Sequence, residues 1–349
     1  EEEKILNIYN WSDYIGVNTI KNFEKETGYK VNYDTYESTA AAEAKFMTGN
    51  MGYDAVVADA SSLPHLLPLG LFATLDKSKI PNWNNIDPAI LKLLEKHDPG
   101  NRHMIPHFRS FTGFTYDRDW LAKIMPNAPI DSAKFLFDPE VIGKFKSCGV
   151  SFMDSSLDVF ALALMSAGMN PNAKSVAELK IAADMVYKVR PYIRGFDSAN
   201  YLNAIANREL CVVMTWSGDY AVAQERAAKS GKKINYGYTI PKEGAIMTLD
   251  GWLISATAPN PEGAYAFLNF NLQGKIAADN VNTVKYGTTN LASLPFIDKA
   301  LMANPAISPT PEIVARAVLF DDPPQELTRI RSKMWQRLKA NTYSPKQLY

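Results

Sequence analysis

The sequence predicts an α/β protein made of two lobes. Its 349 residues are about twice the roughly 150 residues of a typical domain, and strand and helix patterns alternate from the N-terminus onward. Two extended segments, 104–116 and 235–241, have the length and composition expected of crossings between lobes. We therefore expect two α/β lobes, each assembled from discontinuous parts of the chain.

The alternation is clearest at the start of the chain. Residues 4–9 mix β-branched and aromatic side chains, which is typical of a strand, and residues 18–27 have a helix pattern that ends at Gly28. Because strands that alternate with helices form mostly parallel sheets, we expect ligands to bind at loops that follow strands. The later segments that we expect to be strands, helices or extended chain are 31–36, 38–47, 53–58, 104–116, 148–152, 159–169, 176–189, 210–216, 235–241, 261–272 and 326–340.

Composition excludes several classes of function. Thirty-seven Lys and Arg residues balance thirty-seven Asp and Glu residues, so the chain lacks the basic excess of a nucleic-acid-binding protein. No apolar run approaches the roughly 18 residues of a membrane-spanning helix. The acidic start, Glu1 to Glu3, has no basic or apolar leader pattern, so we expect that a signal peptide has been removed.

Motifs of catalysis and of metal binding are missing from the sequence. It contains no GxSxG, GxxxxGKS/T, GxGxxG, HExxH or CxxC pattern. His97, His103 and His107 lie close together, but their surroundings predict loops rather than one helix face. We interpret these histidines as structural or surface residues, and we expect neither a metal nor a cofactor.

The sequence has two cysteines, Cys148 and Cys211. Their number permits one disulfide in an oxidising compartment and equally permits two buried thiols in a reducing one. Their spacing does not decide between these alternatives.

Aromatic residues stand beside acids after predicted strands. Segment 11–14 reads Trp-Ser-Asp-Tyr, segment 216–220 reads Trp-Ser-Gly-Asp-Tyr, and segment 248–252 reads Thr-Leu-Asp-Gly-Trp. A ring face attracts a cation while a carboxylate accepts its N–H bonds, so this combination suits an organic ammonium group. The alternative for each segment is a tryptophan that packs at a strand end beside a solvated acid.

Several motifs together resemble the periplasmic putrescine- and spermidine-binding proteins of bacterial ABC importers, and most closely their putrescine-binding branch. The resemblance extends from about Lys4 to Lys339, and the segments that carry it are 8–15, 75–79, 146–154, 216–219 and 240–245. It implies a type II periplasmic binding protein, an α/β fold with two lobes and a ligand cleft at the hinge. The expected lobes are 1–108 with 243–294, and 109–242 with 295–349.

The resemblance also implies a function. We expect a periplasmic receptor, not an enzyme, that captures a linear diamine or polyamine and delivers it to the membrane permease of an ABC transporter. We further expect a monomer that does not bind nucleic acid. An enzyme on the same scaffold is the less favoured alternative, because the acids are accompanied by rings rather than by a nucleophile or a metal-binding set.

The positions that match the family's motifs predict the ligand-binding residues. The expected amine-holding acids are Asp13, Asp158, Asp219 and Asp250, the expected aromatic walls are Trp11, Trp216 and Tyr286, and the expected polar helpers are Ser12, Tyr14 and Ser198. Asp158 stands where close relatives have a Glu. The two cysteines fall where relatives form a disulfide, which favours a Cys148–Cys211 bridge.

Besides Asp158, three single positions depart from the family pattern. Asp59, Arg109 and Thr248 stand where relatives have Ser, Trp and Phe, and we include all three among the candidate ligand-binding residues. We expect Asp59 and Arg109 to pair, because an isolated guanidinium near a cationic ligand is costly. In the alternative function, Arg109 holds a carboxylate or acyl group of an amine, since arginine suits bidentate carboxylate binding.

Overall fold

The computed structural model describes residues 4–36, 38–198 and 200–349, and the chain forms two compact units. Unit 1 consists of Glu1–Ser110 and Thr248–Ser308, and unit 2 consists of Phe111–Met247 and Pro309–Tyr349. The lobe boundaries expected from the sequence remain a prediction. Glu1 to Glu3, on which the expectation of a removed signal peptide rests, lie outside the described residues.

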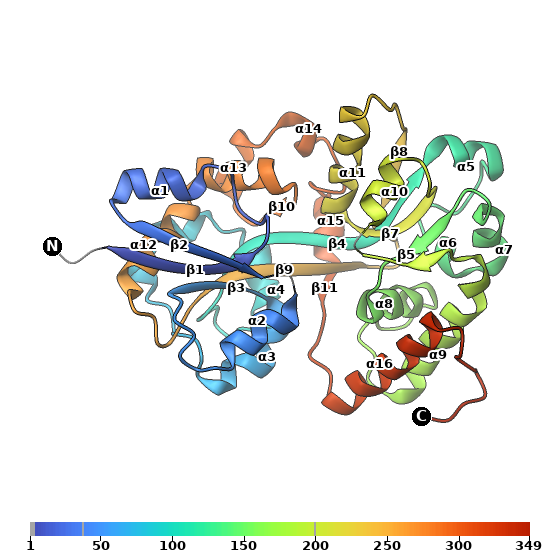
Figure 1. Ribbon diagram of the computed structural model, residues 1–349, viewed down its shortest axis with the longest axis horizontal. Helices are drawn as coiled ribbons and strands as arrows, with labels where there is room; N and C mark the ends of the chain where they lie inside the picture. The colour runs from blue at the N-terminus through green and yellow to red at the C-terminus, as the bar shows by residue number, and fades with distance from the viewer. Residues whose placement is uncertain (1–3, 37, 199) are drawn as a thin grey trace. The chain divides into compact units, whose positions relative to one another are not determined.

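Unit 1 contains a mixed sheet covered by helices (Figure 1). β1 pairs in parallel with β2 and with β3, whereas β3 pairs antiparallel with β9. Its strands are β1 (Ile5–Trp11), β2 (Lys30–Tyr36), β3 (Ala55–Asp59), β10 (Gly287–Thr288) and parts of β4 (Ile105–Asp117) and β9 (Ala245–Ile254). Its helices are α1 (Thr19–Thr27), α2 (Thr39–Phe46), α3 (Leu63–Leu66), α4 (Pro88–Leu94), α12 (Pro261–Asn271), α13 (Gly274–Val284) and α14 (Lys299–Met302).

Helix α1 shows how the sequence specifies this unit. It ends where Gly28 adopts a left-handed conformation with φ 76°, and the Gly28 N–H donates to the Glu24 carbonyl. Its buried Phe23 makes edge contacts with Phe267 and Phe270 of α12, with centroids 5.1 and 5.4 Å apart. The apolar stripe of α1 therefore packs on a helix contributed by a distant part of the chain.

Unit 2 has its own strands and helices. β4 pairs antiparallel with β7 and β8, and β5 pairs in parallel with β6 and β7. The strands are β5 (Val150–Phe152), β6 (Gly195–Phe196), β7 (Val212–Trp216), β8 (Tyr236–Thr239) and β11 (Ala317–Leu319). The helices are α5 (Arg118–Ile124), α6 (Lys134–Phe137), α7 (Pro139–Ile142), α8 (Ser156–Ser166), α9 (Val176–Val189), α10 (Tyr201–Ala206), α11 (Ser217–Lys229), α15 (Pro311–Ala315) and α16 (Gln325–Lys339).

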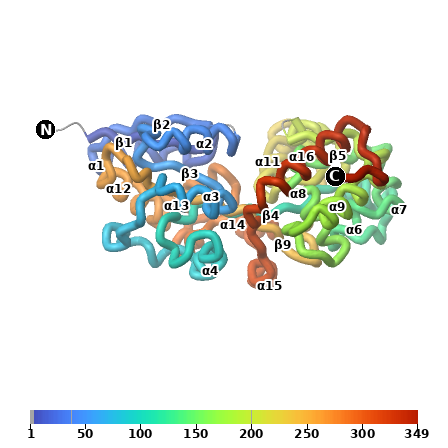
Figure 2. The backbone as a smooth tube through the Cα atoms, turned by 90° about the horizontal axis from the view of Figure 1, so that it is seen from below, coloured from blue at the N-terminus to red at the C-terminus, as the bar shows by residue number. Residues whose placement is uncertain are grey.

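The core of unit 2 is rich in aromatic side chains. Phe114 of β4 stacks on Phe135 of α6 with ring centroids 5.3 Å apart, and both side chains are fully buried. The C-terminal helix α16 lies along α8 and α9 (Figure 2), where Trp335 contacts Phe160 and Phe196. Burial of such large rings supplies a major part of the stabilising free energy of this unit.

The chain passes between the units three times, once between Ser308 and Pro309 and twice inside long strands. The division falls between Ser110 and Phe111 in β4, and between Met247 and Thr248 in β9. Because β4 and β9 contribute residues to both units, neither unit is continuous in sequence. Among the described residues, no helix combines the length and the hydropathy needed to cross a membrane.

Candidate functional site

The loop after β1 carries the first aromatic–acid segment. The Trp11 ring lies 4.6 Å from the ring of Tyr36, and the Ser12 N–H donates to the Tyr36 carbonyl at 3.1 Å. Asp13 is exposed and has a left-handed backbone with φ 54°, a conformation that Asp adopts more readily than most residues. The loop therefore presents a half-buried indole and an exposed carboxylate at the end of the strand.

Tyr14 joins this loop to strand β9. Its buried hydroxyl donates to Oδ2 of Asp250 at 2.6 Å, and its ring contacts Phe108 and Tyr286 at 4.9 and 5.5 Å. Burial, followed by the charge of Asp250, raises the pKa of Tyr14 well above its usual value. The tyrosine thus remains a neutral donor to the carboxylate.

Asp59 lies directly opposite Asp250 on a neighbouring strand. The two acids are register partners in the antiparallel strands β3 and β9, and Asp250 is only 8% exposed. The Ser61 backbone N–H donates to Oδ1 of Asp59 at 2.7 Å. Burial, followed by the charge of Asp59, raises the pKa of Asp250 well above its usual value. We call Tyr14, Asp59 and Asp250 the unit 1 acid set.

Arg109 is a half-buried cation of β4. Its Nε and Nη1 are buried and lack a hydrogen-bond partner among the described residues. Burial lowers the pKa of Arg109, and the charge that opposes this effect is that of Asp87, the N-cap of α4. Arg109 also lies beside Gly287 of β10, whereas the charge of Asp59 acts on Asp250. The charge that acts on Arg109 is thus that of Asp87, and the Asp59–Arg109 pair stays a prediction.

Two other candidates of unit 1 lie near the unit 1 acid set. Thr248 is half-buried and stands two residues before Asp250 in β9, so both side chains lie on the same face of the strand. Tyr286 is half-buried and contacts the Tyr14 ring. The structure thus brings Thr248, Asp250 and Tyr286 into one region of unit 1.

Asp158 lies in the first turn of α8 and is only 5% exposed. Its carboxylate accepts hydrogen bonds from Thr112 Oγ1 at 2.5 Å, from Ser155 Oγ at 2.6 Å and from the Trp216 side chain. Burial raises its pKa, and these donors act in the opposite direction because they stabilise the charged form. The Ser155 side chain also caps the helix by accepting from the Asp158 N–H.

Trp216 and Asp219 stand at the junction of β7 and α11. Trp216 is the N-cap of the helix, and Asp219 lies in its first turn, where a carboxylate is favoured by the helix dipole. Burial raises the pKa of Asp219 to about 6, while a hydrogen bond from the Tyr201 hydroxyl and the charge of Arg226 lower it. Since the Trp216 side chain also bonds to Asp158, we call Asp158, Trp216 and Asp219 the unit 2 acid set.

Sequence reasoning missed Thr112 and Tyr201, whereas the role of Ser198 as a polar helper stays a prediction. Thr112 and Tyr201 hold the two carboxylates of the unit 2 acid set. Ser198 is exposed, and its Oγ accepts from the Asp154 N–H at 2.8 Å. This bond connects Ser198 to Asp154 at the end of β5.

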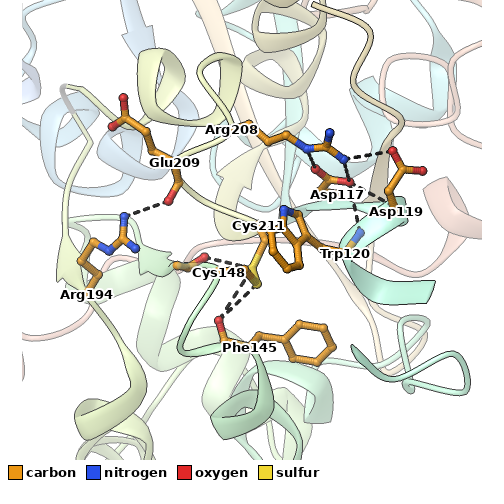
Figure 3. The surroundings of a disulfide bond; sticks show 10 residues. Asp117, Asp119, Trp120, Phe145, Cys148, Arg194, Arg208, Glu209 and Cys211 are labelled. Atoms are coloured by element: carbon orange, nitrogen blue, oxygen red, sulfur yellow. Dashed lines mark hydrogen bonds and ion pairs between the residues drawn. A yellow bond between two sulfur atoms is a disulfide. The ribbon is translucent and has the colours of Figure 1, made fainter. Parts of the chain in front are cut away.

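The disulfide of unit 2 joins the residues that precede strands β5 and β7. Cys148 and Cys211 are bonded, with Cα atoms 5.5 Å apart and 63 residues of sequence separation, which confirms the bridge. The adjacent Gly149 has φ +98°, and a Cβ there would lie 2.5 Å from the Glu209 carbonyl oxygen. Arg208 binds the buried Asp117 at 2.7 Å near the bridge (Figure 3). This region fixes the start of β5 against the start of β7.

The two acid sets can bind cations and have no evident catalytic chemistry. Each combines two carboxylates with an aromatic ring and with hydroxyl or indole donors that hold the carboxylates in place. Among the described residues, no group of three or more histidines, cysteines or acids is arranged to hold a metal ion. His103 instead bonds to the buried Asp98 at 2.8 Å.

Comparison with known proteins identifies the family. The family described as bacterial extracellular solute-binding protein matches residues 18–309. The putrescine-binding periplasmic protein PotF of Escherichia coli is 40% identical over 97% of this chain and 92% of its own length. SpuD of Pseudomonas aeruginosa, also a putrescine-binding periplasmic protein, is 39% identical over 97% of this chain and 93% of its own length.

Solved structures agree with this assignment. The spermidine/putrescine ABC transporter substrate-binding protein PotD of Streptococcus pneumoniae has a TM-score of 0.85 at 26% identity and covers 97% of this chain and 100% of its own. These likenesses confirm the predicted fold class, that of a type II periplasmic binding protein. The relatives are binding proteins of transport systems and not enzymes, as predicted. The chain therefore belongs to the bacterial extracellular solute-binding proteins.

Proposed function

We propose that this protein is a receptor for a linear diamine or polyamine of the putrescine type and that it delivers this solute to an ABC permease. One observation carries the proposal: each unit has two carboxylates beside an aromatic ring, with at least one carboxylate of each pair almost fully buried. A diamine has two ammonium ends, which matches two such acid sets. The names of the relatives PotF and SpuD support the same ligand class.

The electrostatics of the acid sets favour a cationic ligand. Asp158, Asp219 and Asp250 all have raised pKa values, mainly because burial penalises their charged forms. An ammonium group restores the charged form, since it donates N–H bonds and cancels the charge. The indole of Trp216 supplies a face for the same cation or for its methylene groups.

The alternative ligand, an amine with a carboxylate or acyl group held by Arg109, is not favoured. The Arg109 guanidinium is largely buried and is subject to the charge of Asp87. A second anion from a ligand would compete with that acid for the same guanidinium. The relatives named for putrescine also favour the diamine.

The proposal includes a location and partners. The protein acts in the periplasm, with a signal peptide removed, as the relatives are periplasmic proteins. It works as a monomer and hands its solute to a membrane permease. The formal net charge of zero supports the further expectation that it does not bind nucleic acid.

Calorimetric titration tests the proposal. Putrescine, cadaverine, agmatine and spermidine are compared with 4-aminobutyrate and N-acetylputrescine, and we expect the diamines or polyamines to bind and the last two to bind far more weakly. Asp219→Asn and Asp250→Asn should each reduce affinity by more than a hundredfold, since loss of one partner of a buried ion pair costs about 3–5 kcal/mol.

Asp34→Asn is the matched control for both variants. Asp34 is an exposed acid of unit 1 that accepts from the Tyr53 hydroxyl and belongs to neither acid set, so its change should leave affinity unaltered. The proposal is wrong if no amine binds, or if Asp219→Asn reduces the affinity for every bound amine by less than tenfold.

A further inference from the structure

Asp59 and Asp250 are held opposite each other in unit 1. As direct partners in antiparallel strands, they project from the same face of the sheet with Cβ atoms about 4.5–5.5 Å apart. Each carboxylate has its own anchor: the Tyr14 hydroxyl binds Asp250 Oδ2 at 2.6 Å, and the Ser61 N–H binds Asp59 Oδ1 at 2.7 Å. These anchors restrain the two acids from moving apart.

Two facing carboxylates repel each other when both are ionised, and burial strengthens the repulsion. Asp250 is only 8% exposed, and the charge of Asp59 is, after burial, the main cause of its raised pKa. A proton held by the pair removes this repulsion. An ammonium group between the carboxylates removes it in the same way, and the two cations therefore compete for one place.

The ionisable groups around Asp250 leave this competition intact. Tyr14 and Tyr36 have pKa values raised by burial and remain neutral, and burial lowers the pKa of His107 to about 4, so its ring is neutral at pH 7. The Tyr286 ring lies 5.5 Å from the Tyr14 ring. The charge of Arg109 is coupled to Asp87 rather than to Asp250.

We propose that Asp59 and Asp250 act as one acid pair that exchanges a shared proton for an ammonium group of the ligand. This inference rests on the proposed function, because it takes the ligand to be an organic ammonium ion. The amine-free pair holds one proton and one negative charge. When the ammonium group binds, the O–H bond breaks, the proton passes to solvent, and both carboxylates accept N–H bonds from the ligand.

Proton release during amine binding tests this exchange. Putrescine is titrated calorimetrically between pH 5 and pH 8 in two buffers of different ionisation enthalpy, and the difference between the two heats gives the number of protons released. The ligand amines remain protonated throughout, since alkyl ammonium groups of the lysine type have a pKa of about 10.4. Any released proton therefore comes from the protein.

The Asp59→Asn variant isolates the pair. Asparagine also caps helix ends, so the bond from Ser61 can persist while the second charge disappears. We expect wild-type protein to release protons on putrescine binding up to a higher pH than Asp59→Asn does. The affinity of wild-type protein for putrescine should also rise more steeply with pH than that of the variant. Any protons released by the acids of unit 2 are the same in number for both proteins, so they do not contribute to the difference between them. The control Asp34→Asn should match wild type.

A ligand-free measurement separates this inference from the proposed function. In the amine-free protein, the carboxyl ¹³C signal of Asp250 should titrate at a lower pH after Asp59→Asn. Equal proton release by wild type and Asp59→Asn, or an unchanged titration of Asp250, overturns the inference even when putrescine binds. If no amine binds, the proposed function fails, and the ¹³C titration still decides whether the two acids share a proton.

Discussion

Removal of the Cys148–Cys211 bridge should destabilise unit 2 without changing amine binding. The bridge joins residues 63 positions apart, and a loop of that length gives an entropic stabilisation of about 4 kcal/mol. Both cysteines are buried, with 8% and 2% exposure, so the double change Cys148→Ala and Cys211→Ala introduces no buried polar group. The expected decrease in the melting temperature of unit 2 is about 8–16 °C, at 2–4 °C for each kcal/mol.

Differential scanning calorimetry measures this decrease, and amine titration below the transition measures binding. Reduced wild-type protein should melt near the double variant, because both lack the same constraint. Affinity for putrescine should agree within twofold among all three samples, since the bridge does not belong to either acid set. The reasoning is refuted if the decrease is below 2 °C, or if unfolded, unreduced wild-type protein contains two titratable thiols.

Three further changes test the electrostatics of unit 2. The pKa of Asp219 is about 6 in the folded protein and about 3.9 in the unfolded chain. Because the folded state holds this proton more tightly, the amine-free protein should lose stability as pH rises from 4 to 6. Urea titrations should show that Asp219→Asn lacks this loss. Thr112→Val removes a donor to Asp158 and should weaken amine binding about tenfold by calorimetry, and an unchanged affinity would contradict the assigned role. Arg208→Met leaves the buried Asp117 without its cation and should reduce the urea-derived free energy of unfolding by about 1–3 kcal/mol, whereas no change would show that solvent replaces the guanidinium.

Local patterns predicted the elements that begin each unit. The strand expected at residues 4–9 is β1, and the helix expected at 18–27 is α1, because side-chain periodicity and the glycine stop act within a few residues. The extended segment expected at 104–116 is β4, which contributes residues to both units. Such features depend on short-range order, which a single sequence records directly.

The partners of the candidate acids could not be predicted in this way. Asp59 meets Asp250 only through the register of β3 and β9, which lie far apart in the sequence. Thr112 and Tyr201 reach the unit 2 acid set from a strand and a helix with no motif of their own. The Asp59–Arg109 pairing stays a prediction, because the sequence does not record the register that would place these two side chains together.

The sharing of β9 between the units has a consequence for the order in which the chain folds. During synthesis, β3 emerges long before the residues that pair with its second edge, because these belong to Thr248–Ser308. A chain that stops at Met247 would expose an apolar strand edge, which is a template for aggregation. The sheet of unit 1 therefore cannot be completed until the β9 residues that pair with β3 have been made, and this edge of β3 stays open in any shorter chain.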